Sequence, residues 1–76
     1  MNATRRRRLK KIKKALEELA IELDEIHDEE QDYLDNMPEN LQGSERYEKS
    51  EECIDLLDDA IEWVDDAATN LQEAIE

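Results

Sequence analysis

The sequence lacks the devices that usually stabilise a very small protein. Cys53 is the only cysteine and His27 the only histidine, so one chain can form neither a disulfide nor a Cys/His zinc site. A chain of 76 residues buries only about 60% of the surface that its unfolded form exposes. Self-association or docking on a partner is therefore the expected source of additional stability.

Long apolar stretches are also missing. No run of about 18 apolar residues could span a membrane, and no apolar core with a cleavage site follows the basic start, so we expect neither a membrane partner nor a secretory signal. A cytoplasmic location agrees with a single free cysteine.

Motifs for catalysis and metal binding are absent as well. The sequence has no glycine-rich phosphate loop, no calcium loop and no nucleophile with a base nearby, so we expect no enzyme, no cofactor and no metal site. The segment Asp24-Glu25-Ile26-His27 is similar to the acid-x-x-His element of di-iron bundles, which needs two such elements. His27 is therefore expected to be a surface histidine beside the helix contact.

The only proline and the only glycine, Pro38 and Gly43, lie near the middle of the chain and divide it into two halves. Apolar residues recur at alternating spacings of three and four in both halves, which predicts two long helices. We expect an all-α single domain over 1–76: a helix over about 4–36, a turn over 37–43 and a helix over about 45–75. Asn2 or Thr4 and Ser44 are candidate N-caps. A short connection makes the helices antiparallel neighbours.

The alternating residues define one contact stripe on each helix. The first is Leu9, Ile12, Leu16, Leu19, Leu23, Ile26, Tyr33 and Met37, interrupted by Glu30; the second is Tyr47, Ser50, Ile54, Leu57, Ile61, Val64, Ala68, Leu71 and Ile75. A turn centred near residue 40 pairs Leu19 with Ile61, Ile26 with Ile54 and Tyr33 with Tyr47. It also places Ser50 opposite Glu30, where the hydroxyl could satisfy a partly buried carboxylate.

The second half has a further apolar stripe beside the first, which consists of Cys53, Leu56, Ala60, Trp63, Ala67 and Ala74. One partner helix cannot cover both stripes, and an apolar face this wide is typical of a bundle of more than two helices. We expect a homodimeric four-helix bundle, or a hairpin whose second stripe binds another partner, with Trp63 as the anchor.

Charge is divided unevenly along the chain. Residues 1–14 have eight cations and no acid, a charge of +8, whereas the other 62 residues have all 23 acids against Arg46 and Lys49, a charge of −21. Many acids form like-charge pairs four residues apart, each costing roughly 0.2–0.5 kcal/mol. One interpretation is a surface that imitates nucleic acid and competes for a cationic groove; the other is a solvated acidic face. The candidate face is Asp55, Asp58, Asp59, Glu62, Asp65 and Asp66.

The basic segment, residues 4–14, could contact phosphates. It lies beside residues 62–76 in a hairpin, however, and pairing with the acids there or in another subunit would neutralise it. Aromatic residues are absent from it, which disfavours a single-strand stacking site. The remaining charge of −21 opposes tight DNA binding.

A polar cluster surrounds the turn and is the candidate small-ligand site: Tyr33, Asn36, Arg46, Tyr47 and Lys49. Its cations could meet an anion while the tyrosines stack on a ring. Ordinary turn and capping chemistry is the alternative.

The turn has the pattern N-x-P-E-x-L-Q-x-S-E-R, formed by Asn36, Pro38, Glu39, Leu41, Gln42, Ser44, Glu45 and Arg46. With the basic start and two acidic helices, it resembles small acidic helical-hairpin proteins of bacteriophages and prophages. The resemblance implies a phage product in the host bacterial cytosol. Small acidic phage proteins resemble the nucleic-acid-mimicking anti-CRISPR inhibitors in size and charge.

Three functions remain open. The first is an inhibitor whose acids occupy the basic nucleic-acid-binding groove of a host defence protein. The second is a nucleotide immune-signal sponge that uses the turn cluster, and the third is a structural or assembly protein.

Overall fold

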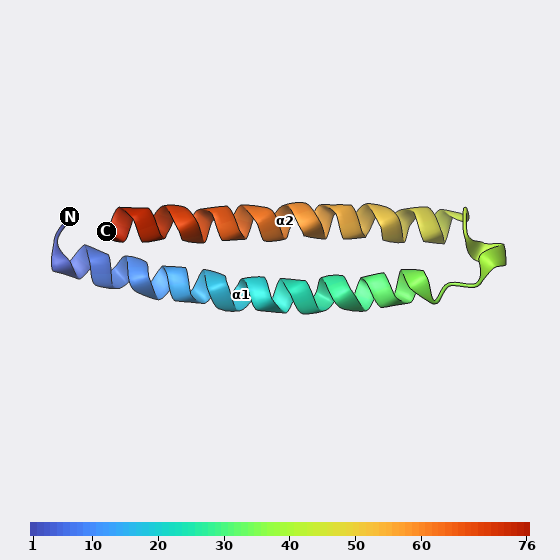
Figure 1. The fold of residues 1–76 in the computed structure, drawn as a ribbon, viewed down its shortest axis with the longest axis horizontal. Helices are drawn as coiled ribbons and strands as arrows, with labels where there is room; N and C mark the ends of the chain where they lie inside the picture. The colour runs from blue at the N-terminus through green and yellow to red at the C-terminus, as the bar shows by residue number, and fades with distance from the viewer.

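The computed structural model describes all 76 residues and consists of two long antiparallel helices joined by a short turn (Figure 1). Helix α1 spans Ala3–Asp35, the 3-10 turn η1 spans Glu39–Leu41, and α2 spans Glu45–Ile75. The hairpin is a rod with extents of 60 × 14 × 13 Å, and both termini lie at the same end. The predicted all-helical hairpin is confirmed.

Local capping explains where the helices begin. Asn2 accepts a hydrogen bond from the Arg5 backbone N–H at 2.8 Å, and Ser44 accepts one from the Tyr47 N–H at 3.3 Å. Both satisfy N–H groups of a first turn, which have no partner within the helix.

The turn follows from two residues. Pro38 comes three residues after the end of α1, and Met37 before it is non-helical, because a residue that precedes proline avoids helical geometry. Gly43 has φ +88°, a conformation that costs little without a Cβ.

The predicted contact stripe of α2 faces α1 along its whole length. All nine residues, from Tyr47 to Ile75 at spacings of three and four, are buried or half-buried. Ser50 is 4% exposed, and its hydroxyl donates a hydrogen bond of 2.7 Å to Glu30 Oε1 of α1. The predicted juxtaposition of Ser50 and Glu30 is therefore confirmed.

The predicted stripe of α1 is only half right. Alternate members, among them Leu9, Leu16 and Leu23, face α2 as expected. The other members do not: Ile12, Leu19, Ile26 and Tyr33 are 45–53% exposed. The residues one position later take their place against α2, namely Lys13, Ala20, His27 and Leu34.

This correction amounts to a rotation of α1 about its axis. Ala20 is buried, and Leu34 occupies the buried position near the turn that Tyr33 was expected to share with Tyr47. The pairings proposed for Leu19 with Ile61 and Ile26 with Ile54 are wrong, because the α1 member of each pair lies on the flank of the rod.

Candidate functional site

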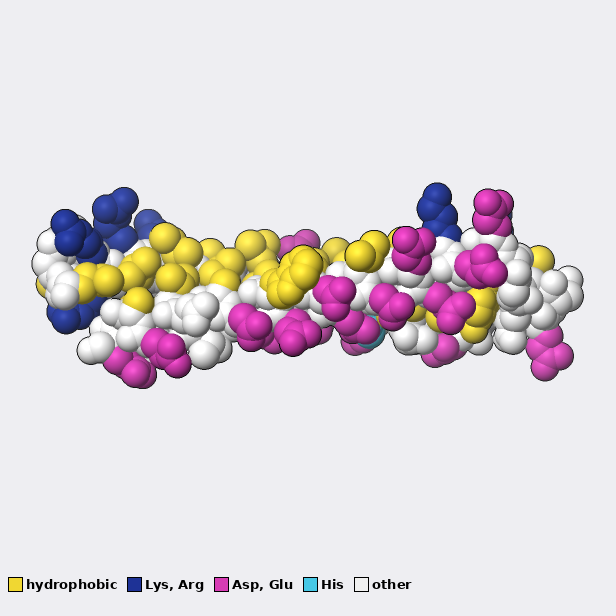
Figure 2. Space-filling model, turned by 90° about the horizontal axis from the view of Figure 1, so that it is seen from above, with side chains coloured by type: hydrophobic (Ala, Val, Ile, Leu, Met, Phe, Trp, Pro, Cys, Tyr) yellow, Lys and Arg dark blue, Asp and Glu magenta, His cyan; other side chains and the backbone are white.

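The rod has two flanks of different chemistry. Figure 2 shows a band of hydrophobic side chains along one edge, acidic side chains along the other, and a cluster of Lys and Arg at the end of the rod that holds the N-terminus. We call the first the apolar flank. It consists of Ile12, Leu19 and Ile26 of α1 together with Cys53, Leu56, Ala60, Trp63 and Ala67 of α2.

One hollow joins the α1 and α2 parts of the apolar flank, and a second lies between its α1 part and the contact stripe of α2. One, of about 400 Å³, is lined by Ile26, Glu30, Cys53, Leu56 and Leu57. The other, of about 290 Å³, is lined by Leu19, Glu22, Leu23, Ile26 and Val64. The displaced residues of α1 and the second stripe of α2 therefore belong to one surface.

The second stripe is largely open to solvent. Trp63 is 71% and Leu56 61% exposed, and Cys53 is exposed as a free thiol. Ala60 and Ala67, which come before and after Trp63 in the stripe, are half-buried. Contiguous exposed apolar surface of this kind marks interaction sites in soluble proteins.

The predicted acidic residues all lie on α2 and are all exposed. Asp58 also has a structural contact, because its Oδ1 lies 2.9 Å from His27 Nε2 of α1. His27 Nδ1 lies 3.2 Å from Asp28 Oδ1, so both ring nitrogens face carboxylates. His27 was expected at the surface, but it is half-buried and contacts the opposite helix.

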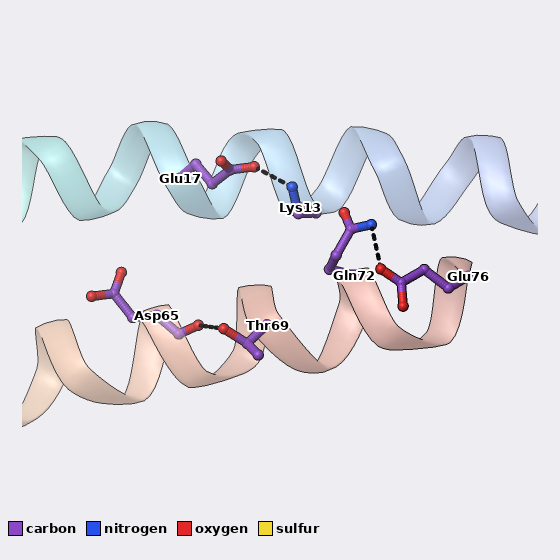
Figure 3. Close-up of polar contacts among 6 residues, drawn as sticks. All are labelled: Lys13, Glu17, Asp65, Thr69, Gln72 and Glu76. Atoms are coloured by element: carbon purple, nitrogen blue, oxygen red, sulfur yellow. Dashed lines mark hydrogen bonds and ion pairs between the residues drawn. The ribbon is translucent and has the colours of Figure 1, made fainter.

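The basic segment forms no ion pair with α2. Lys13 Nζ pairs with Glu17 at 3.0 Å within α1, and Thr69 Oγ1 donates to the Asp65 backbone carbonyl at 3.0 Å within α2 (Figure 3). Glu76 accepts from Gln72 Nε2 at 3.3 Å. Pairing of the basic segment with residues 62–76 of its own chain is thus not observed.

The structure brings together three residues of the turn cluster. Tyr33, Asn36 and Arg46 line a hollow of about 360 Å³, whereas Tyr47 and Lys49 lie outside it. Glu29 and Asp32 line the same hollow and oppose an anionic ligand. The Asn36 side chain donates to the Asp32 carbonyl at 2.7 Å, which is capping chemistry at the end of α1.

No three side chains of the His, Cys, Asp and Glu types are grouped so that they could hold a metal ion. Neither helix has a segment both long and apolar enough to traverse a bilayer.

Comparison of the chain with protein-family models, with curated proteins and with solved structures finds no match.

Proposed function

We propose that this chain is a phage-encoded nucleic-acid mimic that acts in the host bacterial cytosol. Its acidic surface would occupy the basic nucleic-acid-binding groove of a host defence protein, in the manner of anti-CRISPR inhibitors. The resemblance at the turn supports the phage origin, and the distribution of charge along the rod supports the mode of binding.

The supporting observation is the linear charge density of the rod. Residues 17–35 of α1 and residues 45–66 of α2 lie side by side and have ten acids each, against Arg46 and Lys49. That leaves a net charge of −18 over about 30 Å of helix axis, or one charge per about 1.7 Å. Duplex DNA has one phosphate charge per about 1.7 Å of axis. A groove adapted to DNA would therefore meet a similar charge per unit length.

Like charges on one helix oppose its folding, and a cationic partner relieves that repulsion. Binding should therefore be salt-sensitive and should compete with nucleic acid. A merely solvated acidic face would show neither competition nor a defined partner.

The test uses exposed acids that make no contact in the hairpin. Variant Asp55→Asn/Asp59→Asn/Glu62→Gln removes three charges from the α2 face, and Asp58 is left intact because it contacts His27. The matched control, Glu39→Gln/Glu73→Gln/Glu76→Gln, removes three exposed charges that lie outside the two acidic segments. Circular dichroism would check that both variants are folded.

Tagged protein would be used to capture partners from nuclease-treated host lysate at low and high salt. We expect a nucleic-acid-binding protein that added duplex DNA displaces, a loss of about tenfold or more with the α2 variant, and near-normal capture with the control. Capture that DNA does not displace, or that the α2 variant retains, would refute the proposal.

The nucleotide sponge is a second candidate, supported by the hollow that Tyr33, Asn36 and Arg46 share. Arg46→Ala would abolish nucleotide retention on that hypothesis and leave capture of a protein partner unchanged. The two acids in the hollow make this candidate weaker.

We also infer that the chain acts as a homodimer in the form of a four-helix bundle. The support is the apolar flank, which the hairpin alone leaves exposed. Light scattering after size-exclusion chromatography measures the mass directly, and a mass of one chain at micromolar concentration would refute the dimer. The third function, structural or assembly, would rest on this surface alone.

A further inference from the structure

The apolar flank and the charges at its two ends together favour one orientation for a second copy of the chain. It extends from the basic segment at one end toward the turn at the other, where the acidic turn region, residues 28–52, has ten acids against Arg46 and Lys49 (Figure 2). We propose that two copies pack through this flank in an antiparallel orientation, so that the basic end of each lies against the acidic turn region of the other. The inference rests on the proposed dimer and adds its geometry.

The spacing of the exposed α1 residues fits a two-fold axis at Leu19. Arg5, Ile12, Leu19, Ile26 and Tyr33 recur every seven residues, and Leu19 is the central one. An antiparallel copy then places Leu19 against the partner's Leu19, and Ile12 against the partner's Ile26. Arg5 meets the partner's Tyr33, which is 47% exposed and offers a ring face to a guanidinium.

The residues that flank this row have complementary charges. Arg5 and Arg8 line a hollow with Leu9 and Ile12 at the basic end. Near the turn, Glu29 and Asp32 line a hollow with Tyr33, and Arg46 is the one cation in its lining. The same two-fold axis places Arg8 level with the partner's residue 30, one residue from the partner's Glu29, and symmetry repeats the pair, so the dimer gains two attractive contacts.

A parallel dimer would use the same apolar residues but would bring like charges together. Arg8 would lie at the same level along the rod as the partner's Arg8, and Glu29 at the level of the partner's Glu29. More broadly, two +8 segments would lie side by side along with two acidic regions. Electrostatics therefore selects the antiparallel form, as flanking charges do in coiled coils.

The α2 part of the flank agrees with this axis. Trp63 lies at the level of Leu19 along the rod, since both Leu19 and Val64 line one hollow. Trp63 would then lie beside the partner's Trp63, with Ala60 beside the partner's Ala67, and the small alanines permit close approach of two helices.

The area of the flank is sufficient for a dimer. A flat strip about 14 Å wide from Arg5 to Tyr33 has an area of roughly 600 Å² per copy, and the irregular surface of the side chains adds to it. This is near the roughly 800 Å² per partner of a standard interface.

Cysteine cross-linking tests the orientation. In a Cys53→Ser background, Leu19→Cys, Ile12→Cys and Ile26→Cys each replace an exposed residue, so the hairpin should still fold, which circular dichroism would verify. Leu19→Cys should cross-link to itself on mild oxidation. Ile12→Cys mixed with a differently tagged Ile26→Cys should form the mixed product, while Ile12→Cys alone should not cross-link.

The outcomes separate the dimer from its orientation. A cross-link of Ile12→Cys to itself, with a dimeric mass, would overturn the antiparallel arrangement and keep the dimer. A monomeric mass with no Leu19→Cys product would overturn both.

Charge exchange gives an independent measurement on the uncross-linked chain. Arg8→Glu should raise the dimer dissociation constant about tenfold or more at low salt, because two attractive pairs become repulsive. Adding Glu29→Arg should restore most of the affinity, and the effect should shrink as salt is added. Failure of the second substitution to rescue the first would contradict the pairing.

Discussion

The hydrogen bond between Ser50 and Glu30 permits a quantitative test of how the two helices are held together. Ser50 is 4% exposed, and its Oγ donates to Glu30 Oε1 at 2.7 Å across the helix contact. Ser50→Ala removes the hydroxyl donor, so the half-buried carboxylate of Glu30 loses this hydrogen bond. Hydrogen bonds to charged groups contribute about 1.5–3 kcal/mol.

Two effects reduce the expected cost. Glu30 is only half-buried, so water can replace the hydroxyl, which favours the lower limit of about 1.5 kcal/mol. Alanine also has the higher helix propensity, which returns up to roughly 0.5 kcal/mol. We therefore expect Ser50→Ala to lower the free energy of unfolding by about 1 kcal/mol, or about 4–8 °C in Tm for a domain of this size.

Thermal and urea unfolding followed by far-UV circular dichroism would measure this at a fixed chain concentration, because association contributes to stability. The double variant Glu30→Leu/Ser50→Ala makes the contact wholly apolar and should be at least as stable as the native chain. Native stability in Ser50→Ala would refute the reasoning. So would a double variant less stable than Ser50→Ala alone.

Three further substitutions test local features of the hairpin. Gly43→Ala should cost about 1 kcal/mol through the positive φ alone, since no atom lies within 4 Å of an added Cβ, and thermal unfolding of Gln42→Ala is the control. Ser44→Ala should cost about 1 kcal/mol by removing the N-cap, and Ser44→Asp should retain stability in the same measurement. His27→Ala should lower the urea midpoint more than Asp58→Asn does, because it removes buried surface as well as the 2.9 Å contact; equal midpoints would contradict this.

The sequence predicts α2 and the turn almost completely. The N-cap Ser44 sets the start of α2, Pro38 ends the preceding segment, and the alternation from Tyr47 to Ile75 identifies the nine buried or half-buried residues of the contact stripe. These features are local, or depend on one periodic face, so they can be inferred without knowing the partner.

The residues of helix α1 that face α2 are predicted less well from the sequence. An apolar pattern reflects all the contacts that a helix makes, so it does not show which neighbouring element covers each residue. Leu19 and Ile26 belong to the apolar pattern but are exposed in the hairpin. Ala20 and His27 face α2, although the predicted stripe does not include them. Only the three-dimensional arrangement places Ile26 beside Cys53 and Leu56 of the second stripe.

The candidate sites were predictable to different degrees. The exposure of the α2 acids follows from their positions away from the contact stripe, and the structure agrees. The role of Asp58 as a contact for His27 was not predictable, because it depends on the rotation of α1. The same holds for the turn hollow, which includes Glu29 and Asp32 but leaves out Tyr47 and Lys49.

The dimer geometry and nucleic-acid mimicry support one another through the basic segment. A single hairpin would present a +8 end to a cationic groove, and that end would be repelled. In the proposed antiparallel dimer each basic end would lie against the acids of the other copy, and the six acids of the α2 face, which are exposed in the hairpin, would remain accessible. Substitutions that only break the dimer, such as Leu19→Lys, should therefore weaken capture of the target although every α2 acid is retained. Undiminished capture by a monomeric Leu19→Lys chain would separate the two proposals and leave mimicry as a property of one hairpin.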